Sequence, residues 1–235
     1  TVAALKQWMK DRSELEAVIE EDMAWRYIKM NIDTKDEQLQ KSFQFFVQEI
    51  SPNIAPYEYE LNKKLVDVPI LKELNAVDYA IYLREVRNAI ELYREENIPL
   101  FTELTNKAQK FGEISAQMTV KIDGEEKTLQ QASVFLKDTD REKRKEAFEK
   151  INARRLLDKK RLDELLDELI EKRQLVAKHA NFDNYIDYKF QAMGRFDYDK
   201  ADCFAFHKSI AEEIIPLMKE IHMERKELLG NEVLK

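Results

Sequence analysis

The chain has 235 residues, 44% hydrophobic and 36% charged, which is enough for one large or two small domains of a soluble, helix-rich protein. Four glycines and five prolines are too few for an all-β fold. A net charge of −7 gives no general reason to bind nucleic acid. The sequence contains no run of about eighteen apolar residues, so it predicts no membrane-spanning helix.

The N-terminal part of the chain predicts two antiparallel helices. Apolar residues recur at helical spacing over about residues 3–31. Thr34 and Glu37 then have the spacing of a capping box, in which two side chains satisfy unpaired backbone N–H groups at a helix start. We therefore expect a short turn at residues 31–33 and a second helix after it.

Prolines predict where the helices of the next segment are interrupted or end. Pro52 and Pro56 are expected to interrupt the second helix, and Pro69 to end it. The next predicted helix is capped by Asp78 and reaches a break or kink at Pro99.

Residues 118–129 predict a β-hairpin. Apolar and polar residues alternate up to Ile122, and Asp123 and Gly124 follow as a dipeptide whose tolerance of positive φ suits a two-residue turn.

Two further capping boxes, Thr128 with Gln131 and Thr139 with Glu142, predict a short helix and then a long one. If the long helix is unbroken to Lys178, it is roughly 60 Å long. Its apolar stripe falters at Arg154 and Arg155, where we expect its packing partner to change. The predicted core face consists of Phe148, Ile151, Leu162, Leu165, Leu166, Leu169, Ile170 and Val176.

Aromatic residues gather after this helix and form a candidate site. The cluster consists of Phe182, Tyr185, Tyr188, Phe190, Phe196 and Tyr198. It could line a groove for an apolar side chain, but helix–helix packing at a turn is the simpler interpretation. Tyr185, Tyr188 and the neighbouring cation Arg195 are our candidates for substrate binding. Asp197 or Asp199 is expected to cap a last helix, which Pro216 should kink.

These patterns predict a mainly α fold, a multi-helix bundle with long helices and one small β-hairpin at about 118–129. We expect a single helical region over residues 1–235. The alternative is a division into helical hairpins at 1–111 and the β-hairpin with long helices at 112–235. Thr1 already lies in a helical pattern and a helix stop begins at Gly230, so we expect a portion of a larger protein.

Cys203 is the single cysteine, so the chain has no internal disulfide framework, and a reducing, cytoplasmic location is expected. Its apolar neighbours predict a small core residue rather than a nucleophile.

The residues predict neither a catalytic group nor a metal site. The three histidines, His179, His207 and His222, are 28 and 15 residues apart, and none begins a His-Glu-x-x-His motif. Fifteen residues along a helix span roughly 22 Å, too far to share one ion. No Gly-rich phosphate loop or Gly-x-Ser-x-Gly nucleophile motif is present, and no carboxylate pair stands out. Residues 141–161 contain ten Lys or Arg against four Asp or Glu, which we interpret as a solvated helix face rather than a phosphate-binding face.

Four stretches resemble the N-terminal region of oligoendopeptidase F-type zinc peptidases. They are residues 118–133 (MTVKIDGEEKTLQQAS), 136–148 (LKDTDREKRKEAF), 181–188 (NFDNYIDY) and 195–207 (RFDYDKADCFAFH), the last with Pro216 and Leu217 downstream. The resemblance extends over essentially the whole chain in order.

This resemblance implies a relative of the thimet oligopeptidase group, an α-helical peptidase with a deep channel that admits short peptides. In that family zinc binds a His-Glu-x-x-His helix with a further Glu, and the Glu of the motif activates water. None of these residues is present in this chain, so the resemblance transfers no catalytic or zinc-binding role to it. It implies that the intact protein is a zinc-dependent oligoendopeptidase and that these 235 residues alone are inactive.

Two hypotheses follow. In the first, the chain is the N-terminal helical part of a cytosolic zinc metalloendopeptidase. It forms one wall of the channel for short peptide substrates, and its exposed apolar face docks on the C-terminal catalytic portion of the same protein, where zinc is bound. In the alternative, it is a stand-alone helical module that binds a protein or peptide without catalysis.

Overall fold

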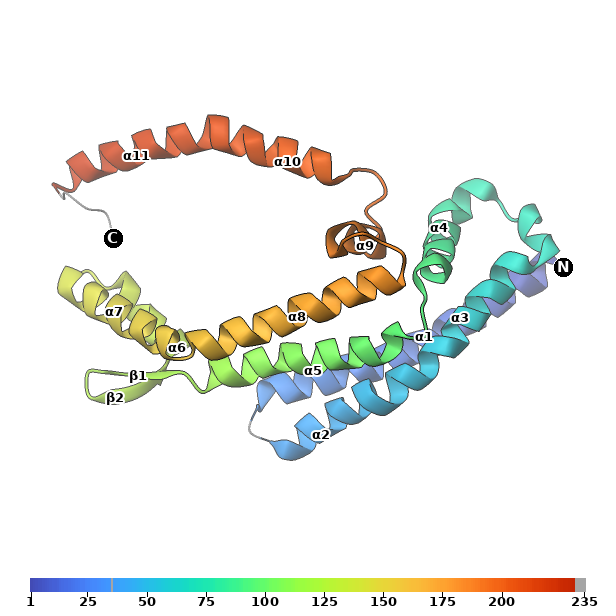
Figure 1. Cartoon of the computed structure of the whole chain (residues 1–235), viewed down its shortest axis with the longest axis horizontal. Helices are drawn as coiled ribbons and strands as arrows, with labels where there is room; N and C mark the ends of the chain where they lie inside the picture. The colour runs from blue at the N-terminus through green and yellow to red at the C-terminus, as the bar shows by residue number, and fades with distance from the viewer. Residues whose placement is uncertain (35, 231–235) are drawn as a thin grey trace.

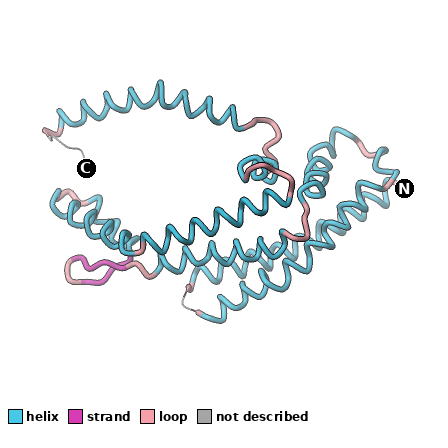
Figure 2. Tube along the Cα trace, in the orientation of Figure 1, coloured by secondary structure: helices cyan, strands magenta, loops and turns pink. Residues whose placement is uncertain are grey.

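Helices dominate the structure, a computed structural model that describes residues 1–34 and 36–230 (Figure 1, Figure 2). The helices are α1 (Val2–Ile32), α2 (Glu37–Phe45), α3 (Ser51–Asp67), α4 (Ala76–Leu92), α5 (Asn97–Ala116), α6 (Leu129–Ala132), α7 (Arg141–Leu157), α8 (Lys159–His179), α9 (Tyr185–Ala192), α10 (Lys200–Ser209) and α11 (Ile215–Leu228). The strands are β1 (Thr119–Ile122) and β2 (Glu125–Thr128). The prediction of a mainly α fold with one small hairpin is confirmed, whereas the possible division at residues 111 and 112 stays a prediction.

Two of the predicted capping boxes are wrong by one or two residues. Asp36, not Thr34, caps α2, where its carboxylate accepts hydrogen bonds from two backbone N–H groups at 2.8 and 3.3 Å. Asp140, not Thr139, caps α7 and accepts from the N–H of Glu142 at 2.9 Å. At α7 the aspartate binds the amide of Glu142 that Thr139 was expected to bind, whereas at α2 it binds the amides of Gln38 and Leu39 rather than that of Glu37.

Side chains just before the first helical residue also cap other helices. Asn75, not Asp78, caps α4 and accepts from the N–H of Val77 at 3.0 Å, while Asp78 lies in the first turn. The box formed by Thr128 and Gln131 is confirmed at the start of α6. Asp199, one of the two predicted caps, opens α10.

Two prolines inside long helices are accommodated by π turns. The turn Phe46–Ile50 precedes Pro52, and the turn Ile210–Ile214 precedes Pro216. A proline ring collides with the carbonyl of an ordinary helical turn, and a π turn widens the backbone at that point. The predicted interruption near Pro52 takes the form of this π turn, and the helix continues from α2 through it into α3, past Pro56. The chain does leave the helix before Pro69, as predicted, and the break near Pro99 lies between α4 and α5.

The hairpin has the predicted turn. Asp123 and Gly124 both have positive φ, 53° and 82°, and the strands pair in antiparallel register from Thr119 opposite Thr128 to Ile122 opposite Glu125. Two positive φ angles in a two-residue loop match the twist of the strands.

The predicted long helix is instead two helices that meet at Asp158 (Figure 1). The N–H of Asp158 turns back to the carbonyl of Arg155 at 3.2 Å. On one side of the break, α7 buries Ala147 and Ile151 against the hairpin, whereas α8 packs along α5. The expected change of packing partner thus takes the form of a break. The predicted core positions Phe148, Leu166 and Ile170 are wrong, because these residues are 57%, 51% and 46% exposed.

The buried apolar residues form separate small clusters rather than one core. One lies between α3 and α4 under the start of α1, one joins α5, α8 and α9, and one lies under the hairpin. None of the helices in residues 1–34 and 36–230 is both long and apolar enough to cross a membrane.

The last helices stand apart from these clusters. Within residues 200–228 no residue is buried, and Figure 1 shows α10 and α11 as one bent rod away from α8. The prediction that Cys203 is a core residue is therefore wrong, because it is only partly buried on α10. Gly230, with φ +59°, follows α11, and the rest of the predicted helix stop, residues 231–235, lies outside the described residues.

Candidate functional site at the junction of α8, α9 and α10

The aromatic cluster divides into two groups. In the first, Tyr188 is 6% exposed, and its ring lies 5.6 Å from that of Phe182 and 5.8 Å from that of Tyr185. This group packs on the buried residues of α5 and α8. Burial raises the pKa of the Tyr188 phenol above its ordinary value of 10.0, so the side chain is neutral at physiological pH.

Tyr185 lies at the edge of this group and begins α9. Its backbone N–H donates to the side-chain oxygen of Gln174 at 3.2 Å, and the guanidinium of Arg173 lies 6.0 Å from its ring centroid. Its ring is partly exposed, so it can contact a ligand that Tyr188 cannot reach.

Arg195 belongs to the second group. Its guanidinium lies 5.0 Å from the ring centroid of Phe190 and 5.8 Å from that of Tyr198. A guanidinium held over aromatic faces keeps its charge and its outer N–H donors available to a carboxylate. The structure thus brings Tyr185 and Tyr188 together and places Arg195 with different aromatic partners.

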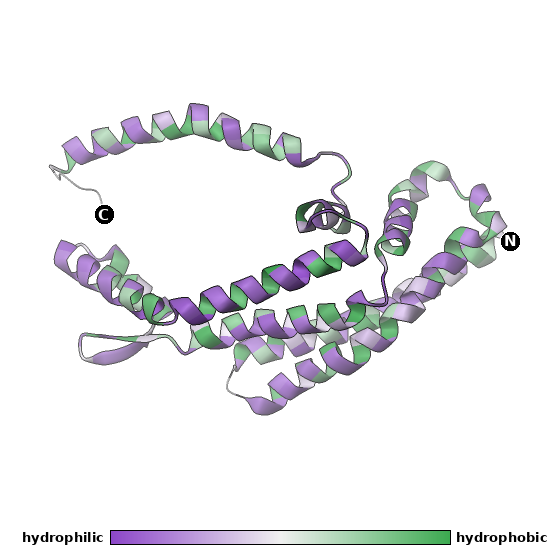
Figure 3. Cartoon of the chain, viewed as in Figure 1, coloured by the Kyte–Doolittle hydropathy of each residue, from purple (hydrophilic) through white to green (hydrophobic). Residues whose placement is uncertain are grey.

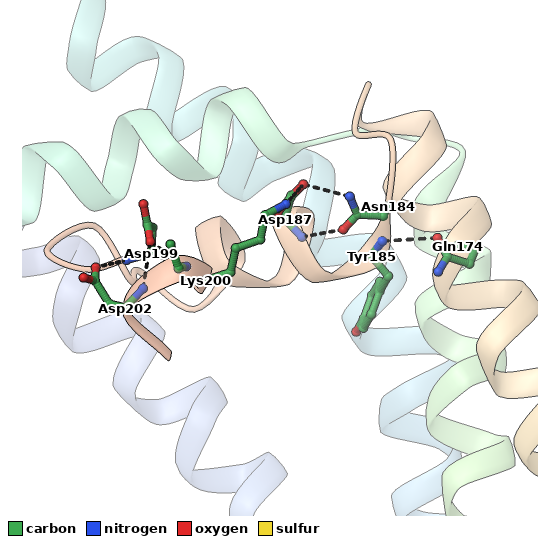
Figure 4. A network of polar contacts seen from close by, with 8 residues as sticks. Gln174, Asn184, Tyr185, Asp187, Asp199, Lys200 and Asp202 are labelled. Carbon is green, nitrogen blue, oxygen red and sulfur yellow. Dashed lines mark hydrogen bonds and ion pairs between the residues drawn. The ribbon is translucent and has the colours of Figure 1, made fainter. Parts of the chain in front are cut away.

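A polar network fixes the start of α9 and joins it to α10 (Figure 4). Asn184 caps α9, accepting from the N–H of Asp187 at 3.0 Å and donating to its carboxylate at 2.7 Å. Lys200, the first residue of α10, binds the same carboxylate at 2.9 and 3.1 Å. These hydrogen bonds from Lys200 and Asn184 lower the pKa of Asp187 from its ordinary value of 3.8.

Asp199 and Asp202 complete the network with a reciprocal cap (Figure 4). Asp199 accepts from the N–H groups of Ala201 and Asp202 at 2.7 and 3.1 Å, and its own N–H donates to Asp202 at 2.9 Å. The direction in which α10 leaves α9 is therefore set by short polar contacts at its first turn.

The segment between α9 and α10 is anchored on α4. The guanidinium of Arg84 lies 4.4 Å from the ring centroid of Phe196, and its Nη1 lies 3.6 Å from the carboxylate of Asp197. Gly194 has φ +63°, and a Cβ there would lie 3.0 Å from Oε1 of Glu85. A side chain at residue 194 would thus be strained and would displace Glu85.

Sequence reasoning missed these positioning residues. Asn184 and Asp187 have the spacing of a helix cap, which could have been recognised. Arg84 and Lys200 carry no local signal, because their partners lie on other elements.

Beyond its first turn, the rod formed by α10 and α11 carries large apolar side chains that no described residue buries. Figure 3 shows apolar residues along its whole length. The large apolar side chains that are exposed are Phe204, Phe206, Ile214, Ile215, Leu217, Met218, Ile221, Met223 and Leu228. We call this set the α10–α11 face. Large apolar side chains exposed in this number mark an interaction site.

The histidines do not form a metal site with other residues. Nδ1 of His179 lies 2.8 Å from Oδ1 of Asn97, and the His207 ring contacts Phe204 and Phe206. Among residues 1–34 and 36–230 no three His, Cys, Asp or Glu side chains are grouped as metal ligands would be. Within residues 1–34 and 36–230, the side chains therefore do not form a group that would hold a zinc ion.

Two sequence models of one peptidase family match the chain. The Peptidase M3 N-terminal domain matches residues 1–93, and Peptidase family M3 matches residues 134–235. Between them they leave out only residues 94–133. No curated protein sequence matches the chain.

Solved structures of similar fold include three peptidases. An oligoendopeptidase F has a TM-score of 0.93 and 25% identity over 100% of this chain and 41% of its own. An oligoendopeptidase F from Bacillus anthracis has a TM-score of 0.82 and 24% identity over 89% of this chain and 38% of its own. Pz peptidase A, solved with an inhibitor, has a TM-score of 0.85 and 24% identity over 99% of this chain and 43% of its own. The chain thus spans about two fifths of the length of these proteins.

Proposed function

Because the chain belongs to peptidase family M3 and carries its N-terminal domain, we propose that it is the helical N-terminal part of a zinc-dependent endopeptidase that hydrolyses short peptides in the cytoplasm. In this proposal the chain forms one wall of the substrate channel and selects peptides. The zinc ion and the catalytic groups belong to the rest of the peptidase, and no chemical step is assigned to the residues of this chain.

The observation that carries the proposal is the α10–α11 face. Phe206 is 65% exposed, Leu217 51% and Leu228 80%, although each is large and apolar. Burying such surface stabilises a protein by roughly 25 cal/mol per Å², so a helix with this face gains stability when a partner covers it. The chain spans about two fifths of its solved relatives, and we propose that the catalytic portion of the same protein is the partner.

The junction of α8, α9 and α10 supports a role in peptide selection. We propose that Tyr185 and Arg195 contact the substrate, the first through its partly exposed ring and the second through a guanidinium that can bind a peptide carboxylate. Tyr188 contributes by holding Tyr185, because its own ring is buried. Arg84, Asp187 and Lys200 position these groups and set the direction of α10.

Hydrolysis of a quenched fluorescent peptide tests the proposal. The purified 235-residue chain and the longest chain that the gene encodes are compared with zinc and then with a chelator. We expect only the longer chain to cleave the peptide, and the chelator to stop it.

Two outcomes contradict the proposal. Zinc-dependent cleavage by the 235-residue chain alone would show that it holds a catalytic metal. A gene that encodes no chain with peptidase activity, together with peptide binding by the 235 residues, would support the stand-alone binding module instead.

A further inference from the structure

A second candidate binding site lies away from α9, between other helices. A pocket of about 750 Å³ is lined by the end of α1, by α2 and by the C-terminal half of α5. In Figure 1 these segments lie near the hairpin end of the molecule, whereas α9 lies near the opposite end of α8. The volume falls within the range of about 300–1,000 Å³ that is typical of ligand sites.

The apolar part of the pocket is built from three aromatic rings. Phe43, 2% exposed, forms the deep part, and the ring of Tyr27 lies 5.7 Å from it. Tyr27 and Phe111 are 51% and 57% exposed, so both present ring surface to an occupant. A Cβ added to Gly112 would meet no atom within 4 Å, which leaves open space beside α5.

The polar part of the pocket consists of carboxamides with unused hydrogen-bonding capacity. Within the described part of the chain, the hydrogen-bond partner of Nε2 of Gln109 is the thioether sulfur of Met30, at 3.2 Å, and a thioether is a weak acceptor. The side chains of Gln44 and Gln117, both in the lining, make no hydrogen bond within the described part of the chain. Each of these groups carries both a donor and an acceptor.

Among the described residues, the lining is almost free of charge. Its one ionisable carboxylate, Glu113, binds the ammonium of Lys110 at 2.6 Å. An ion entering the pocket would lose its hydration without gaining a partner of opposite charge, so the lining favours an uncharged ligand. Carboxamides match the N–H and C=O groups of a peptide backbone, and the rings match an apolar side chain.

We propose that this pocket binds a short uncharged peptide segment that carries an aromatic side chain. The carboxamides of Gln44, Gln109 and Gln117 bind its backbone, and Tyr27, Phe43 and Phe111 enclose its ring. This inference is independent of the proposed function, because it involves neither the α10–α11 face nor Tyr185, Tyr188 and Arg195.

Titration of the isotope-labelled chain with N-acetyl-Ala-Phe-Ala-Ala-amide, followed by NMR chemical shifts, tests the proposal. We expect saturable shifts in residues of α1, α2 and α5 that line the pocket. Gly112→Phe, which fills the open space, should weaken binding about tenfold or more, whereas Gly112→Ala should change it less than about twofold.

A second pair of variants keeps the test decisive if Gly112→Phe impairs folding. Gln44→Leu combined with Gln117→Leu should weaken binding about tenfold, and Gln130→Leu, at an exposed glutamine outside the pocket, should not. Shifts confined to α9, or equal binding of N-acetyl-Ala-Glu-Ala-Ala-amide, would overturn the proposal. So would unchanged binding in the paired glutamine variant.

Discussion

Asn97 and His179, which are 82 residues apart in the sequence, form a partly buried polar contact between α5 and α8. Nδ2 of Asn97 donates to the carbonyl of Val176 at 3.0 Å, so its Oδ1 is free to accept from Nδ1 of His179 at 2.8 Å. In this contact Nδ1 of His179 is therefore the donor and Oδ1 of Asn97 the acceptor. Asn97 is 1% exposed, and Arg94 adds a hydrogen bond to the carbonyl of His179 at 2.9 Å. These contacts join the start of α5 to the end of α8.

Asn97→Ala should lower the free energy of unfolding by about 1–3 kcal/mol, because it removes the acceptor of Nδ1 of His179 and one of the two donors to the Val176 carbonyl, which keeps only the N–H of Ala180. Denaturant unfolding followed by circular dichroism measures this loss. Asn152→Ala is the matched control, since Asn152 is partly exposed and bonds only within its own helix, to the carbonyl of Phe148 at 2.8 Å. Equal losses of unfolding free energy in the two variants would mean that the contacts of Asn97 with His179 and Val176 add no more stability than a hydrogen bond within one helix.

Local patterns in the sequence predicted most elements, since periodicity, caps and turn residues act over a few positions. The hairpin turn at Asp123 and Gly124 and the cap of Thr128 were predicted for this reason. The break at Asp158 was not, because it results from α7 and α8 packing on different partners. The Asn97–His179 contact has no local signal, because the two residues are far apart in the sequence and neither belongs to a recognisable motif.

The candidate site was predicted only in outline. The aromatic cluster was visible, but the sequence could not show that Tyr188 is buried while Tyr185 remains partly exposed. Helical periodicity marks an apolar stripe but does not say what covers it. The same kind of pattern buries Val176 in α8 and leaves Phe206 exposed on α10.

Glu58→Gln should stabilise the protein at neutral pH. Although the Glu58 side chain is exposed overall, desolvation of its carboxyl by neighbouring atoms and the charge of Glu16 raise its pKa above the ordinary value of 4.5, and Arg12 opposes them. The folded state therefore holds this proton more tightly than the unfolded state, so ionisation of Glu58 lowers stability as pH rises above about 4.5.

Unfolding at a series of pH values checks this sign. The gain from Glu58→Gln should be smallest below pH 4.5 and should grow as pH rises through the raised pKa. Glu73→Gln, at an exposed carboxylate, controls for the general change in net charge. A gain that is constant over this range would show that the pKa of Glu58 does not differ between the two states.

Two glycines should respond in opposite ways to alanine. Gly124 has φ +82° in the hairpin turn, so Gly124→Ala should cost about 1–2 kcal/mol. Gly112 lies within α5 with room for a Cβ, so Gly112→Ala should stabilise by about 0.5–1 kcal/mol through helix propensity. Thermal unfolding of both variants measures the contrast. A stabilising Gly124→Ala would show that the turn adopts another conformation in solution.

The docking role of the α10–α11 face predicts an effect that depends on chain length. Phe206 is 65% exposed, so Phe206→Lys in the 235-residue chain should change the free energy of unfolding by no more than about 0.5 kcal/mol. In the longest chain that the gene encodes, the same change should cost about 3 kcal/mol or more if the ring is buried there. Glu213→Gln, on the same rod, makes the same change in net charge and should cost little in either chain. If Phe206→Lys has equally small effects in both chains while the longer chain still cleaves peptides, this ring does not contact the catalytic portion, and the docking surface must lie elsewhere.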